Sequence, residues 1–120
     1  MRRRFILLTG AAGLVLSARP VLAHAHLRAA TPAVGSTVEK LPEKLVCDFT
    51  ETLEPSLCRI EVRGPAGTRV DRNDLAIAGD PKRIAVSLLP GGAGDYAVTW
   101  VAVSVDTHRT EGRFRFTVSA

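Results

Sequence analysis

All three histidines of the 120-residue chain lie in two short segments, "LAHAHL" near its start and "SVDTHR" near its end. His24 and His26 are two residues apart in the first segment, and Asp106 and His108 are two residues apart in the second. Residues at this spacing project to the same side of an extended chain. In the second segment, one carboxylate oxygen and one imidazole nitrogen could therefore meet a single ion.

Residues 1–23 have the pattern of a secretory signal peptide. Three arginines precede an apolar run from Phe5 to Ala18, and Ala23 is the small residue expected before a cleavage site. The run is too short to span a bilayer comfortably. We therefore predict export by the Sec or the twin-arginine route, a mature chain that is not inserted in a membrane, and cleavage that leaves His24 first. Cleavage after Ala25 is an alternative, because Ala23 and Ala25 also form an A-x-A pattern.

A terminal His24 would offer its α-amine and its imidazole Nδ1, which can close a chelate ring on one metal ion. With the Asp106 carboxylate and the His108 imidazole, the set holds three nitrogens and one oxygen. Such a set suits Cu(II) or Ni(II), and Cu(II) stands highest in the divalent affinity order. Met1 is the only methionine, so residues 24–120 lack the thioether ligands that favour Cu(I). The residues predicted to bind the metal are His24, Asp106 and His108.

Other interpretations of these residues stay open from the sequence. Asp106 could cap a turn through its side chain, His108 could be a solvated loop residue, and the first residues of a domain are often disordered. A free His-Ala-His terminus could also bind copper through its amine, two deprotonated backbone amides and the His26 imidazole. That mode needs no fold and would leave Asp106 and His108 unused.

The charge balance argues against nucleic-acid binding. The chain has 16 Lys and Arg and 12 Asp and Glu, but four of the arginines and none of the acidic residues fall within residues 1–23. Removing four basic residues from 16 leaves 12, equal to the acidic count, so residues 24–120 have a formal net charge of zero. The charge of residues 24–120 therefore gives no support to nucleic-acid binding.

The residues that would hold the metal need a framework, and the sequence predicts one built from strands. Polar and apolar residues alternate with a period of two in several stretches, and no sustained helical pattern appears. Turn-forming Gly and Pro separate these stretches, while "RVDRNDLAIAGDP" could hold a strand or only a loop. About seven short strands in one small domain, residues 24–120, predict an all-β Greek-key β-sandwich. The predicted strands are residues 26–30, 37–38, 45–49, 57–63, 83–88, 96–103 and 112–120.

Two cysteines, Cys47 and Cys58, alternate with apolar neighbours, so both side chains are predicted to point inward. A disulfide is allowed in an exported protein. Two buried free thiols are an equally open interpretation.

Four segments in this order resemble the CopC copper-resistance family of periplasmic copper-binding proteins: "HAHLRAATPAVGSTV", "LVCDFTETLEP", "LLPGGAGDYAVTWVAVSVDTH" and "EGRFRFTV". The resemblance covers essentially all of residues 24–120. It implies a seven-stranded sandwich related to immunoglobulin and cupredoxin-like folds, with a Cu(II) site at His24, Asp106 and His108. The family's methionine-rich Cu(I) segment has no counterpart, and Arg109 stands where the family often has Pro.

The resemblance implies a periplasmic, non-enzymatic protein that buffers, sequesters or delivers Cu(II), with an inner-membrane copper transporter as its partner. Two alternatives come from other classes of protein. One is an immunoglobulin-like interaction module that binds no metal. The other is a small copper-brace oxidoreductase, although Tyr96 and Trp100 are more simply explained as core aromatics than as parts of a catalytic face.

Overall fold

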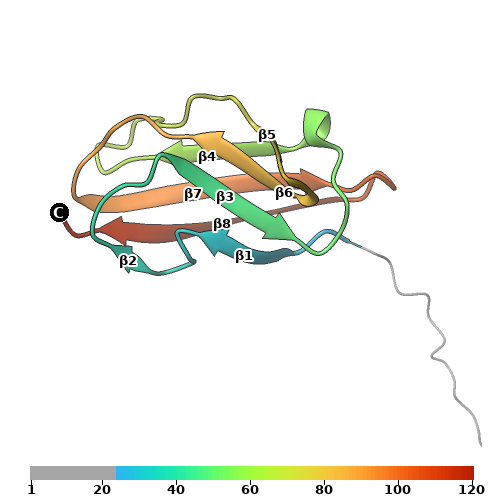
Figure 1. The fold of residues 1–120 in the computed structure, drawn as a ribbon, viewed down its shortest axis with the longest axis horizontal. Helices are drawn as coiled ribbons and strands as arrows, with labels where there is room; N and C mark the ends of the chain where they lie inside the picture. The colour runs from blue at the N-terminus through green and yellow to red at the C-terminus, as the bar shows by residue number, and fades with distance from the viewer. Residues whose placement is uncertain (1–23) are drawn as a thin grey trace, which may run out of the picture.

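The computed structural model describes residues 24–120, and the predicted signal peptide, residues 1–23, lies outside the described residues. Two four-stranded sheets pack face to face (Figure 1). The first sheet has the order β1-β3-β6-β5 and the second the order β2-β8-β7-β4. The strands are β1 (Leu27–Thr31), β2 (Thr37–Val38), β3 (Lys44–Phe49), β4 (Arg59–Arg63), β5 (Ala76–Ala78), β6 (Asp80–Ser87), β7 (Gly94–Val103) and β8 (Arg109–Val118).

The predicted all-β sandwich is confirmed, with one strand more than the seven expected. The additional strand is β5, in the stretch that could have been a strand or a loop. It is three residues long, pairs only with β6 and leaves Ile77 38% exposed. The strand predicted at residues 57–63 starts later, because a 3₁₀ turn at Pro55–Leu57, η2, precedes β4. No helical segment within residues 24–120 has the length and apolar character needed to cross a membrane.

Alternate residues of β7 and β8 fill the space between the sheets. Tyr96 of β7 and Phe116 of β8 face each other in register and stack with ring centroids 5.2 Å apart. Trp100 reaches across to Phe49 of the first sheet, edge to face, at 5.1 Å. Such aromatic pairs add about 0.5–1.5 kcal/mol each beyond the burial of their area. The Trp100–Phe49 pair connects the two sheets, whereas the Tyr96–Phe116 pair lies within the second sheet.

The two cysteines are free thiols in the structure. Cys47 is fully buried in β3 of the first sheet, whereas Cys58 is half-buried just before β4 of the second sheet. Burial, with a smaller contribution from the charge of Asp48, raises the pKa of Cys47 to about 12. The Cys47 thiol therefore stays protonated at neutral pH and behaves as a small apolar side chain.

The outer edge of β4 is covered by the segment that follows it. Val70 N–H donates to the Val62 carbonyl at 2.7 Å, and Val62 N–H donates to Asp71 Oδ1 at 2.7 Å. The buried Asp71 carboxylate also accepts hydrogen bonds from Arg69 Nε at 2.9 Å and from the Asn73 amide at 3.0 Å. The β4 edge of the second sheet is thus covered partly by the backbone of the following segment and partly by the Asp71 carboxylate.

We expect Asp71→Asn to lower the free energy of unfolding by roughly 2 kcal/mol, because a neutral amide cannot accept all three hydrogen bonds and leaves buried donors unpaired. Burial alone would raise the pKa of Asp71, but the bonds from Arg69, Val62 and Asn73 outweigh it and lower the pKa below its ordinary value of 3.8. The stabilisation is therefore present above that pH and lost as pH falls through the folded-state pKa.

Urea unfolding of the two proteins from pH 7 to pH 3 measures this effect. The difference should be full at pH 7 and shrink below about pH 4. Asp95→Asn is the matched control, because Asp95 is exposed and accepts only the Thr117 hydroxyl, and its effect should stay within about 0.5 kcal/mol. Equal stabilities of the Asp71→Asn protein and the parent at pH 7 would contradict this role.

Candidate metal centre

The start of the described chain and the turn between β7 and β8 lie at the same end of the sandwich (Figure 1). The imidazole rings of His24 and His108 have their centroids 4.9 Å apart. The loop after β3 joins them, because Val105 N–H donates to the Thr52 carbonyl and Glu54 N–H donates to the Val103 carbonyl. Three segments that are far apart in the sequence therefore meet where the metal ligands were predicted.

The segment from His24 to His26 is held along its backbone. Ala25 has no exposed surface and belongs to the core, so its methyl group anchors the segment. Thr110 Oγ1 of β8 donates to the Ala25 carbonyl at 2.5 Å. On the other side, Thr50 N–H donates to the His26 carbonyl at 3.0 Å. These contacts fix the backbone from His24 to His26 against the sandwich. His24 itself is half-buried.

The turn from Ser104 to His108 presents the second pair of predicted ligands. Ser104 N–H donates to the His108 carbonyl at 3.0 Å, and Thr107 N–H donates to the Ser104 carbonyl at 2.8 Å. Thr107 has a φ of +72°, in the left-handed region, which lets the chain reverse. The Ser104 hydroxyl donates a short hydrogen bond to Asp106 Oδ1. Asp106 therefore stabilises the turn, as the capping interpretation expected, and still directs Oδ2 toward His108.

The Asp106 carboxylate is an anion at neutral pH. The hydrogen bond from the Ser104 hydroxyl, with smaller contributions from His108, lowers the pKa of Asp106 below its ordinary value. Asp106 Oδ2 lies 3.3 Å from His108 Nδ1. An ionised carboxylate beside two imidazoles supplies the charge and the nitrogen donors that a divalent copper or nickel ion prefers.

His108 Nδ1 provides an independent indication of a missing partner. This nitrogen is buried and has no hydrogen-bond partner in suitable geometry. Among residues 24–120, it is the one buried side-chain nitrogen or oxygen that lacks such a partner. Buried polar atoms are normally satisfied, so each exception needs a reason such as an ion. The residues of this corner therefore fit a bound cation.

The predicted ligands are neighbours but are not arranged as a finished site. Within the described residues, no three His, Cys, Asp or Glu side chains already stand around one point that could hold an ion. A metal would have to draw the Asp106 carboxylate and both rings toward itself. The exposed His26 lies beside the cluster, with its ring 6.2 Å from that of His24.

Three hydroxyl side chains that position the cluster were not found from the sequence: Thr50, Ser104 and Thr110. Their roles depend on contacts with residues far away or on the geometry of one turn. Ser and Thr occur throughout the chain, and nothing in the spacing of these three distinguishes them.

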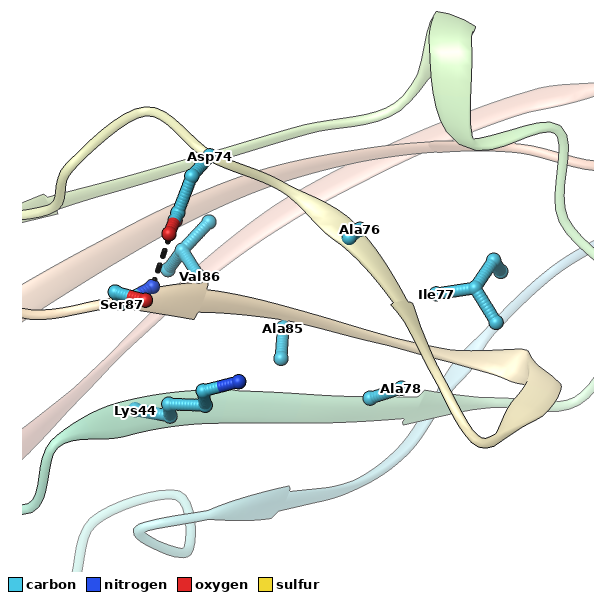
Figure 2. A pocket seen from close by; sticks show the side chains of 8 residues that line it. All are labelled: Lys44, Asp74, Ala76, Ile77, Ala78, Ala85, Val86 and Ser87. Carbon is cyan, nitrogen blue, oxygen red and sulfur yellow. Dashed lines mark hydrogen bonds between the residues drawn. The ribbon is translucent and has the colours of Figure 1, made fainter.

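A second place where a ligand could sit is a small hollow beside β5 (Figure 2). At one side of the hollow, Ser87 N–H donates a hydrogen bond to Asp74 Oδ1 at 2.8 Å (Figure 2). The hollow contains no histidine or cysteine, and it shares no residue with the histidine cluster. It is lined by Lys44, Asp74, Ala76, Ile77, Ala78, Ala85, Val86 and Ser87. These mostly small apolar side chains offer no metal-binding set.

Known proteins resemble this chain over most of its length. Residues 27–119 match the family model described as the CopC domain. Protein YobA of Escherichia coli K12 is 33% identical over 104 residues, which cover 82% of this chain and 81% of YobA. Copper resistance protein C of Pseudomonas syringae pv. tomato is 34% identical over 115 residues, which cover 90% of each chain.

Comparison with solved structures also points to this family. The crystal structure of PcoC, described as a methionine-rich copper resistance protein from Escherichia coli, aligns with a TM-score of 0.71 and 33% identity. The alignment covers 81% of this chain and 100% of PcoC. The family model, the relatives and the structure agree, and the chain belongs to the CopC family.

Proposed function

We propose that this chain is exported to the periplasm, is cut after Ala23, and binds one Cu(II) ion through the His24 amine and imidazole, the Asp106 carboxylate and the His108 imidazole. In this role it buffers, sequesters or delivers copper and does not catalyse a reaction. One observation carries the proposal. The ring centroids of His24, the expected first residue, and His108 lie 4.9 Å apart, and His108 Nδ1 lies 3.3 Å from Asp106 Oδ2.

Membership of the CopC family supports copper as the cargo, since relatives carry the name copper resistance protein C. The oxidation state is argued from the donors. PcoC is described as methionine-rich, whereas the single methionine of this chain is Met1, within the predicted signal peptide. Nitrogen and carboxylate oxygen favour Cu(II) over the Cu(I) that thioethers bind.

The burial of Ala25 supports cleavage after Ala23. A cut after Ala25 would remove both His24 and a residue with no exposed surface, and would leave a gap in the core. A cut after Ala23 keeps this anchor and exposes the His24 amine beside the cluster. An inner-membrane copper transporter is the acceptor we propose for delivery.

Two variants test the ligand set. Asp106→Ala and His108→Ala should each weaken Cu(II) binding by at least about 100-fold, because even the outer partners of metal ligands are worth 10–100-fold. The affinity is measured by competition with a chelator, and electron paramagnetic resonance should show nitrogen couplings that decrease in His108→Ala.

The control is His26→Ala, which should bind Cu(II) as the parent does. Parent-like binding by both ligand variants, together with loss of binding in His26→Ala, would mean that the His-Ala-His terminus holds the copper. Absence of stoichiometric Cu(II) binding by the processed parent would instead favour an interaction module.

The terminal amine is tested by acetylating it selectively in the processed protein. The acetyl group converts the amine into an amide and opens the chelate ring without supplying a new amine, so we expect Cu(II) affinity to fall by about 100-fold or more. Mass spectrometry of the exported protein fixes the natural terminus and the bound metal together. Undiminished binding by the acetylated protein would exclude the amine as a ligand.

A further inference from the structure

A His-Ala-His terminus can bind copper in two ways, and each way requires a different conformation of the terminal segment. In the folded mode the ion is shared with the turn that contains Asp106. In the local mode the chain wraps around the ion, and the backbone nitrogens of Ala25 and His26 both bind it. The local mode needs those two nitrogens, so the partners they already have decide how accessible it is.

The nitrogen of His26 is already engaged. Its N–H donates to the Thr50 hydroxyl oxygen at 2.9 Å, and the same hydroxyl donates to the His24 carbonyl at 3.2 Å. One side chain therefore holds the backbone on both sides of Ala25. The Thr50 amide adds a third bond, to the His26 carbonyl at 3.0 Å.

These bonds prolong the pairing of β1 with β3 beyond its last strand pair, Leu27 with Phe49. Opposite Thr50, the Thr110 hydroxyl holds the Ala25 carbonyl, and the Ala25 methyl group is buried. Wrapping the terminus around an ion would turn His26 N–H away from Thr50 and lift Ala25 out of the core. The extended conformation leaves the His24 side chain beside His108 instead.

We propose that Thr50 is a positioning residue that holds the first three residues of the mature chain extended, and so directs copper to His24, Asp106 and His108 rather than to the local His-Ala-His mode. The inference rests on the proposed function. Thr50 itself binds no metal. Its hydroxyl acts by occupying the backbone nitrogen that the competing mode would use.

The test replaces the hydroxyl with a methyl group in the processed protein, Thr50→Val, and loads it with one equivalent of Cu(II). Loss of two hydrogen bonds should shift the ratio of the local to the folded mode by about thirtyfold. The local mode has four nitrogen ligands, so new nitrogen couplings should appear in the electron paramagnetic resonance spectrum and the visible absorption should move to shorter wavelength. Adding His26→Ala to Thr50→Val should abolish this new spectrum.

Matched variants separate positioning from general damage. Thr50→Ser keeps the hydroxyl and should keep the parent spectrum, and Thr99→Val changes an exposed threonine of β7 and should do the same. Thr110→Val removes the hydrogen bond to the Ala25 carbonyl, so it should shift the spectrum in the same direction as Thr50→Val. This variant replaces Thr50→Val in the test if the Thr50→Val protein does not fold.

The outcomes distinguish this inference from the proposed function. A parent spectrum in both Thr50→Val and Thr110→Val, still dependent on His108, would overturn the role of Thr50 and leave the shared site intact. A His26-dependent spectrum with four nitrogens in the parent itself would overturn both.

Discussion

The whole arrangement depends on the docking of residues 24–26 at one end of the sandwich. The burial of Ala25 and the hydrogen bonds from Thr50 and Thr110 fix this segment between the two sheets. Without them, His24 would belong to a free tail, and its ring would have no fixed relation to His108. A packing contact of one methyl group and a few hydroxyl groups therefore determines whether the three predicted ligands can act as a set.

In the turn from Ser104 to His108, the hydrogen bond that holds the turn and the proposed metal ion compete for the same Asp106 carboxylate. The Ser104 hydroxyl lowers the pKa of Asp106 and holds the turn, but it also occupies Oδ1. A metal ion would compete for that carboxylate and would also offer a partner to His108 Nδ1, which has no well-formed hydrogen bond although Asp106 Oδ2 lies 3.3 Å away. The corner is thus organised by its own hydrogen bonds in the absence of an ion.

How much the sequence predicts depends on the range of the interactions. The alternation of β8 is plain because one face packs on the core and the other faces solvent, as its buried Phe114 and exposed Arg113 show. The edge strand β5 is too short to produce such a pattern. The proximity of His24 to His108 could be inferred from a family resemblance but not from spacing, because only the folded sheets bring them together. The role of Thr50 escapes prediction for the same reason, since its two partners lie in another segment.

One consequence concerns the order of events in the life of the molecule. The proposed ligands come from the first residues of the mature chain and from the turn before its last strand, so a chain still emerging from the ribosome has only part of the set. Under the proposed function, the nitrogen of His24 is a peptide nitrogen until the predicted signal peptide is removed, and only then can it serve as an amine. If the proposed cleavage after Ala23 holds, the complete ligand set forms only after both folding and processing.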